Sequence, residues 1–368
     1  MVITDFDLPS DNIGEITLIG TAGGYGESIV IHLGNQNWAV VDSCKDPLNG
    51  QCLPLEYLKS IGVNVKEQVK LLVCTHWHND HIKGLSTLFG ICESARLCFA
   101  PCSDTEKFLL FVNLEQLKAT SNQSTTEFAK CLEINELRGS PIMRAGPDRN
   151  LLTLNNGNSE SKIYSLSPSD ATLTAYDYEI STLINSIGPL GKIIAEGPNA
   201  KSVALSVNLG KHSAILGADL EISGNKYEGW TNILDNSTVI NKKRQTSLLK
   251  ISHHGSSNGY DARIWNELLK ENAVGKLTPY NKSKLPRAEM VKVYTDHTQN
   301  LYSTSNNDSD SKTKKRDRSI EKAIKEYRPS LTELRYTKGI LRSRIEIDNE
   351  DAEWKTDTYG PAFHINAS

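Results

Sequence analysis

The feature that most constrains the fold of this chain is an apolar run that leads directly into a loop rich in histidine. Residues 69–75 (VKLLVCT) are almost continuously apolar, which is typical of a strand buried on both faces of a sheet. The next six residues, 76–81 (HWHNDH), contain three histidines and one aspartate. Neither a helix nor a strand can direct four such side chains at one point, whereas a tight loop can. The pattern predicts a buried strand whose C-terminal end carries the chemistry.

The segments around this loop indicate an α/β layer architecture. A helix is expected over 82–92 and a strand over 96–100, so that the chain reads strand, loop, helix, strand. Before the loop, strands over 28–33 and 38–41 are expected to form a hairpin. The other expected strands are 16–20, 144–152, 161–166, 202–209, 213–216, 248–252, 339–347 and 352–357, and the other expected helices are 54–61, 104–137 and 171–187.

One domain is expected to span residues 1–368, with two insertions. Residues 104–192 are expected to be a partly helical insertion that shapes the substrate pocket. Residues 303–335 are expected to be a flexible basic insertion, because 303–315 (STSNNDSDSKTKK) is polar and low in complexity. The run 312–328 holds eight basic and three acidic residues, and it is interpreted either as a solvated helix or as a phosphate-binding arm.

Composition limits the classes of partner and compartment. A formal net charge of −3 over 368 residues gives no overall attraction for nucleic acid or membranes, so a polyanion would have to bind a local basic patch. Lys242, Lys243 and Arg244 form one such patch. No apolar run approaches the roughly 20 residues that span a bilayer, and seven cysteines, an odd number, argue against a disulfide framework. A cytoplasmic protein without a membrane partner is therefore expected.

The histidine-rich loop is expected to serve two adjacent metal ions. His76 and His78 are predicted to bind one ion, and Asp80 and His81 are predicted to bind the other. Imidazole and carboxylate ligands suit zinc, manganese or iron. We expect two divalent ions, zinc or manganese.

Two later strand ends supply the remaining expected ligands. Asp219 follows a short apolar strand and is predicted to bridge both ions. His253 and His254 follow the strand 248–252. His253 is the predicted ligand because it lies nearer the strand end, and His254 is predicted to contact substrate or donate a proton. Asp42 is expected to orient the metal loop without binding an ion.

This ligand set predicts a hydrolytic mechanism. Two ions roughly 3.5–4 Å apart that share a water lower its pKa toward neutrality, and the resulting hydroxide attacks a carbonyl or phosphoryl centre. Asp80 is predicted to bind an ion and to orient this nucleophile, so Asp80 and His254 are the predicted catalytic residues. Lys250, which lies just before the histidine pair, is expected to be solvated, and pairing with a phosphate is the alternative.

The combined motifs resemble the metallo-β-lactamase superfamily, in the branch that contains the hydrolase domain of the competence DNA-uptake protein. The matching segments are 23–28 (GGYGES), 41–43 (VDS), 75–84 (THWHNDHIKG), 199–202 (NAKS), Asp219 and 253–256 (HHGS). The His-His-Gly-Ser segment is the one that selects this branch. The resemblance covers most of the chain and implies an αββα sandwich: two mixed sheets face to face, helices outside and metals at one edge.

The sequence departs from the superfamily in one respect. Most members supply a further histidine between the first motif and the bridging aspartate. Here the only histidine between His81 and Asp219 is His212, which lies in an expected hairpin turn. The ion at His76 and His78 is therefore expected to be bound more weakly, by an oxygen-richer ligand set that favours manganese.

Three functions are compatible with these motifs. The first is a metal-dependent phosphodiesterase or nuclease that acts on nucleic acid or nucleotides, which the resemblance and the local basic clusters favour. The second is an acyl hydrolase that cleaves an ester, thioester or lactam through a similar charged transition state. The third is a non-catalytic effector or binding module with a protein partner, for which metal would be dispensable. The resemblance also implies a setting in DNA handling or bacterial defence.

Overall fold

The apolar run that precedes the histidine-rich loop forms β4 (Val69–Val73), an inner strand of an eight-stranded sheet. The computed structural model describes residues 6–100, 123–157, 159–185, 198–240, 242, 245–306, 319 and 338–366. The strand order in this first sheet is β15 (Lys355–Tyr359), β14 (Lys338–Glu346), β1 (Ile13–Thr21), β2 (Glu27–His32), β3 (Trp38–Val41), β4, β5 (Arg96–Phe99) and β6 (Met143–Arg144). Strands β3 to β6 run parallel, so β3 and β4 end at the same edge.

A second eight-stranded sheet repeats this arrangement. Its strand order is β16 (Phe363–Ile365), β13 (Leu301–Ser303), β12 (Leu269–Leu277), β11 (Thr246–Lys250), β10 (His212–Leu216), β9 (Leu205–Leu209), β8 (Ser159–Ser165) and β7 (Arg149–Asn156). Strands β10, β11, β12 and β13 run parallel to one another, whereas the pairs β7–β8, β8–β9 and β9–β10 are antiparallel. In both sheets the parallel strands lie next to an antiparallel meander, so each sheet is mixed.

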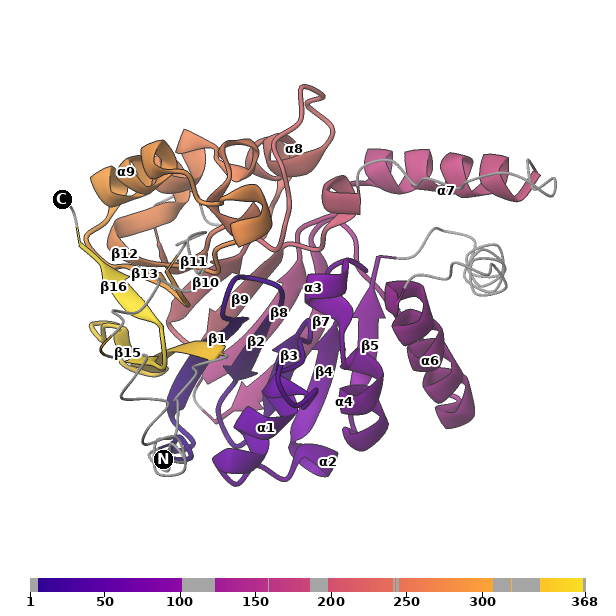
Figure 1. Cartoon of the computed structure of the whole chain (residues 1–368), viewed down its shortest axis with the longest axis horizontal. Coiled ribbons are helices and arrows are strands. Elements are labelled where there is room, and N and C mark those ends of the chain that lie inside the picture. Colours follow the sequence, from indigo (N-terminus) through magenta and orange to yellow (C-terminus); the bar gives the residue numbers. More distant parts are fainter. Residues whose placement is uncertain are drawn as a thin grey trace.

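Helices cover the outer face of each sheet (Figure 1). On the first sheet lie α1 (Leu53–Ser60), α2 (Val65–Gln68), α4 (Leu85–Ile91) and α6 (Gln123–Arg138). On the second sheet lie α8 (Gly229–Asn236) and α9 (Ala288–His297). Two further helices are α3 (Asn79–Ile82), in the histidine-rich loop, and α7 (Asp170–Asn185). The layers are therefore helix, sheet, sheet, helix.

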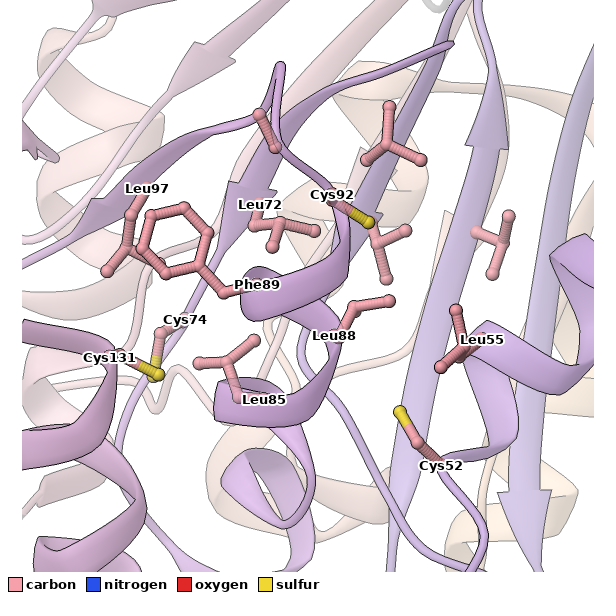
Figure 2. Close-up of a cluster of buried hydrophobic side chains, with 14 of the residues drawn as sticks. Cys52, Leu55, Leu72, Cys74, Leu85, Leu88, Phe89, Cys92, Leu97 and Cys131 are labelled. Carbon is pink, nitrogen blue, oxygen red and sulfur yellow. The ribbon is translucent and has the colours of Figure 1, made fainter. Parts of the chain in front are cut away.

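Alternation along β4 shows how one strand serves two apolar layers. Leu72 and the following Cys74 point toward the helices, where Phe89 of α4 joins them (Figure 2). Leu71 and Val73 point the other way, into the core between the two sheets. Successive side chains of a strand point to opposite faces, so a strand covered on both faces must be apolar throughout. Burying each such side chain contributes about 1.5–3 kcal/mol.

Lys276 is a charged-type side chain in the core between the sheets. Lys276 of β12 is fully buried, and its Nζ donates hydrogen bonds to the carbonyl oxygens of Ile16 (2.6 Å) and Leu341 (3.0 Å) on the opposite sheet. Burial lowers the pKa of Lys276 to about 7, against the opposing effect of the Glu15 carboxylate. A neutral amine has two N–H donors, and these two bonds use both of them.

The αββα sandwich predicted from the sequence is confirmed by the strand order and the three apolar layers. The elements that were not predicted include α2, α3, α8, β12, α9, β13 and β16. The two expected insertions fall largely outside the described residues. Only α6, β6–β8 and α7 are described from 104–192, and only 303–306 and residue 319 from 303–335. Within the described part of the chain, no helix is both long and apolar enough to span a bilayer.

Candidate metal centre

Four strands, β3, β4, β10 and β11, end beside one another at one edge of the sandwich. Asp42 follows β3, the loop 76–81 follows β4, Asp219 follows β10 and His254 lies shortly after β11. Asp42, Ala218 and His254 have left-handed backbone angles, with φ of 59°, 46° and 54°. A non-glycine residue in this region costs of order 1–3 kcal/mol and persists where the surrounding structure holds it in place. Backbone outliers therefore gather where the strand ends converge.

The Asp80 group is a set of four side chains whose donor atoms lie within 4.8 Å of one another: Asp80, His81, Asp219 and His254. Nε2 of His254 is 3.4 Å from Oδ2 of Asp80 and 3.6 Å from Oδ2 of Asp219. Nε2 of His81 is 3.5 Å from Oδ1 of Asp219 and 3.7 Å from Oδ2 of Asp80. Four donors at about 2.1 Å from a tetrahedral ion lie ~3.4 Å apart. The spacing of this group fits one such ion.

The His76 group is a second set that shares one member with the first: His76, His78 and Asp219. Nε2 of His76 is 3.1 Å from Nδ1 of His78 and 3.7 Å from Oδ2 of Asp219. The two carboxylate oxygens of Asp219 thus face histidines of both groups. The structure divides the histidine-rich loop as the sequence predicted, with Asp219 shared. That the groups bind ions remains a prediction.

Asp42 holds histidines of both groups. Its Oδ2 accepts a hydrogen bond from Nδ1 of His81 (2.7 Å) and another from the hydroxyl of Thr75 (2.7 Å), while its Oδ1 accepts the Thr75 backbone N–H (2.7 Å). The Thr75 oxygen in turn lies 3.0 Å from Nδ1 of His76. These bonds fix one ring nitrogen of each histidine and leave Nε2 directed at the cluster. Ligand histidines are usually held in this way by a carboxylate or carbonyl.

The polar atoms of the cluster fit a pair of divalent ions. Nε2 of His81 and Oδ1 of Asp219 are buried without a hydrogen-bond partner among the described residues. Nδ1 of His254 bonds to the carbonyl oxygen of Thr278 (3.0 Å), which also leaves its Nε2 toward the cluster. Buried polar atoms without partners are rare and call for an explanation. Ion binding at these atoms would supply that explanation.

The structure places His254 in the candidate ion site, where the sequence analysis expected His253. His254 lies in the Asp80 group, whereas His253 does not. Nδ1 of His253 is 3.0 Å from Oδ1 of Asn258 and 3.1 Å from Oε1 of Glu221, and its Nε2 accepts a hydrogen bond from Asn199 (3.2 Å). Both histidines have a left-handed backbone, with φ of 46° and 54°. Two such residues in succession turn the chain so that the second histidine, not the one nearer the strand, faces the cluster.

A buried ion pair lies beneath the centre. Lys250 is fully buried, pairs with Glu27, and donates a hydrogen bond from Nζ to the carbonyl oxygen of Ala218 (3.1 Å). The expectation that Lys250 is solvated was wrong, because an inner strand of a covered sheet leaves this side chain no path to water. Oε1 of Glu27 also lies 3.9 Å from Nδ1 of His81. Lys250 therefore balances the negative charge of the carboxylates near the ligands.

The electrostatics of the cluster link ion binding to protons. Burial lowers the pKa of His81, but Asp219, Asp80 and Asp42 together raise it well above its usual range. Burial, with the adjacent His81, holds the pKa of His76 well below its usual range. In the ion-free protein a proton on His81 partly balances the carboxylates. Ion binding must displace this proton, so affinity is expected to fall as the pH is lowered.

An apolar pocket opens beside the His76 group. Its lining residues are Cys74, Thr75, His76, Trp77, Phe99, Ala100, Phe128, Tyr176 and Lys201. Trp77, which lies between two predicted ligands, meets the ring of Phe128 edge-on at 5.7 Å and that of Tyr176 at 6.1 Å. Trp77 therefore packs against the apolar layer between the first sheet and its helices.

Sequence reasoning missed several residues that surround the ligands. Thr278 and Tyr280 follow β12, which was not predicted because its first half, residues 270–272, is polar and exposed. Glu27 directly follows the glycine-rich turn and was not recognised as a site residue. A carboxylate at the start of an otherwise apolar strand could have indicated a buried ion pair. Glu221, two residues after the predicted bridging aspartate, carried no signal of its own.

Comparisons with known proteins concern the fold alone. No family model matches the sequence, and no curated protein matches it. Matching solved structures include the metallo-β-lactamase fold protein YhfI from Bacillus subtilis, at 15% identity and a TM-score of 0.32, covering 64% of this chain and 69% of that chain. The metallo-β-lactamase SMB-1 matches at 14% identity and a TM-score of 0.33, covering 67% and 79%. A mutant of the β-hydroxylase CmlA matches at 14% identity and a TM-score of 0.32, covering 67% and 36%. These values are low, so the αββα assignment rests on the strand order and layers of this chain itself.

Proposed function

We propose that this chain is a metal-dependent hydrolase that cleaves phosphodiester bonds of nucleic acid or nucleotides. The observation that carries the proposal is the pair of donor groups at the strand ends, which share one carboxylate and have the spacing of ion ligands. The proposed ligands are His76, His78, Asp80, His81, Asp219 and His254. Zinc or manganese ions bound there would lower the pKa of a shared water toward neutrality.

Asp80 is the carboxylate best placed to act on a nucleophile. Its side chain is 15% exposed, whereas that of Asp219 is 3% exposed and that of His81 is fully buried. Asp80 therefore lies on the solvent side of its group, where it can accept a hydrogen bond from an attacking water and orient it. Asp219 and His81 are enclosed, so their proposed role is to bind the ions and fix their positions. The second predicted catalytic residue, His254, is reassigned to the ligand set.

Local charge supports a phosphodiester substrate. The loop that carries Tyr280, whose ring stacks on His254 at a centroid distance of 5.0 Å, also carries the exposed cations Lys282, Lys284 and Arg287. Cations near a cleavage site attract the phosphates of a nucleic acid although the net charge of the chain is negative. Of the basic cluster 242–244 only residue 242, and of the run 312–328 only residue 319, lie within the described part of the chain.

Reconstitution with single metals tests the proposal. The protein is stripped with a chelator, loaded with zinc or manganese, and assayed on single-stranded DNA, RNA, bis-p-nitrophenyl phosphate and a chromogenic lactam. Metal-dependent phosphodiester turnover with two ions bound per chain is expected. Asp219→Asn should abolish turnover and reduce bound metal, whereas Asp296→Asn, an exposed change on α9, should do neither. Absence of phosphodiester turnover with every metal would refute the proposal.

The apolar pocket beside His76 favours an acyl hydrolase as the second candidate. Trp77, Phe99 and Phe128 line it, and such walls suit an aliphatic or aromatic acyl group rather than a phosphate. A p-nitrophenyl ester series of increasing chain length distinguishes the two functions. Rates that rise with chain length and exceed those on phosphodiesters would favour the acyl function.

A further inference from the structure

A pair of tyrosines lies between the proposed ligands and the protein surface. We infer that Tyr25 and Tyr280 form a stacking platform for the bases of a single-stranded nucleic acid. This inference rests on the proposed function and narrows its substrate class. The platform is distinct from the ligands, because neither tyrosine belongs to the Asp80 group or the His76 group.

The rings lead outward from the centre. The ring of Tyr280 is stacked on that of the proposed ligand His254, at a centroid distance of 5.0 Å and an interplanar angle of 23°. Tyr25 meets Tyr280 edge to face, at 6.1 Å and 65°. Tyr25 is 55% exposed, so much of its ring is open to solvent. Only the ring of Tyr280 separates Tyr25 from the proposed ligand His254. The exposed ring of Tyr25 can therefore contact a planar group of a substrate that is bound at the centre.

Tight packing of a glycine-rich turn holds Tyr25 in this position. A Cβ on Gly24, whose φ is 74°, would lie 1.6 Å from the carbonyl oxygen of Pro279, so only glycine fits there. The backbone N–H of Asn281 also donates a hydrogen bond to the carbonyl oxygen of Gly23 (3.2 Å). The turn and the Tyr280 loop are therefore fixed against each other, and the two rings are arranged before any ligand binds.

The other end of this turn lies beside the centre. A Cβ on Gly26 would lie 2.6 Å from Cβ of Cys44 and 3.6 Å from the carbonyl oxygen of Asp80. The turn thus spans the distance from the ligand Asp80 to the exposed ring of Tyr25. A phosphate at the centre and a base on the platform would belong to the same or adjacent nucleotides.

The exposed cations in the loop of Tyr280 favour nucleic acid as the occupant of the platform. Lys282, Lys284 and Arg287 are exposed and follow Tyr280 within seven residues, and the first acidic residue after them is the exposed Glu289 of α9. Aromatic rings beside exposed cations are the combination that binds single strands, since the rings stack on bases and the cations attract phosphates. Bases in a duplex are stacked on one another and are not available to such a ring. The platform therefore fits a single strand rather than a duplex.

Binding of a fluorescent oligothymidylate to the metal-free full-length protein tests the platform without cleavage. The matched ligand is an abasic oligomer with the same number of phosphates, so that stacking is separated from charge. The unchanged protein is expected to prefer the oligomer with bases by about 5- to 160-fold, the range for loss of one stacked base. Tyr25→Leu should remove most of this preference, and Tyr25→Phe should retain it.

Tyr227→Leu is the matched control, because Tyr227 is 54% exposed and has a lysine, Lys226, near its ring at 5.0 Å. It should leave the preference unchanged. Equal affinity for both oligomers, no binding of either, or full preference in Tyr25→Leu would each overturn the inference. Phosphodiester turnover without base-dependent binding would refute the platform alone. Base-dependent binding without turnover under any metal would refute the proposed function and leave the platform standing.

Discussion

Replacing Lys276 by methionine should make the stability of this protein depend less on pH. The Nζ of Lys276 lies between the two sheets and donates to two carbonyl oxygens, at 2.6 and 3.0 Å. Burial lowers its pKa from 10.5 to about 7. Methionine has a similar length and no charge, so Lys276→Met removes the titrating group while filling most of its volume.

The expected magnitude follows from the two pKa values. Between about pH 7 and 10.5 the unfolded chain binds a proton at Lys276 that the folded protein does not, so the stability of the unchanged protein rises with pH in this window. A difference of about 3.5 units at 1.36 kcal/mol per unit is about 5 kcal/mol. The two lost hydrogen bonds cost the variant about 2 kcal/mol at every pH. The variant should therefore be about 3 kcal/mol more stable at pH 6 and about 2 kcal/mol less stable above pH 10.5.

Urea unfolding of both proteins from pH 6 to 10.5, with chelator present, measures this difference. Other titrating groups are the same in both proteins and cancel in the comparison. Lys270→Met, an exposed change on the same strand, is the control for removing a lysine side chain from β12 and is measured over the same pH range. A constant difference for Lys276→Met across the range would refute the reasoning, because Lys276 would then have the same pKa folded and unfolded.

Three further predictions concern the centre and the turn beside it. His254→Gln should lower metal content toward one ion per chain, measured by atomic emission, while His253→Gln should leave two, and the reverse result would return the ligand role to His253. Asp42→Asn should weaken binding of both ions by about 10- to 100-fold in a chelator competition, since it orients a histidine of each group; weakening of one ion only would contradict this. Gly24→Ala should lower the melting temperature more than Gly62→Ala does. Both glycines have positive φ, but of the two only Gly24 has backbone atoms within 4 Å of an added Cβ. Equal effects would contradict this, because the loops would then have moved apart to remove the clash.

The sequence was sufficient for features that depend on local pattern. The apolar run before residue 76, the position of the histidines after it and the acid at the end of a second strand were readable, since each follows from residue type and spacing. These patterns indicated an α/β layer architecture and five of the six proposed ligands, all except His254, and the family resemblance that they carry implied the αββα sandwich. The same patterns predicted that Asp42 orients the metal loop.

Only the tertiary structure decided which histidine of the pair faces the cluster and what surrounds it. The choice depends on two consecutive left-handed residues, a backbone property that no spacing rule reveals. Lys250 and Lys276 are charged-type residues on strands, and their burial depends on layers that meet only after folding. Tyr25 and Tyr280 are 255 positions apart in the sequence, yet their rings are in contact because a glycine allows two loops to approach closely. The sequence therefore specified the ligands one strand end at a time, and the packing of the two sheets determined how they meet.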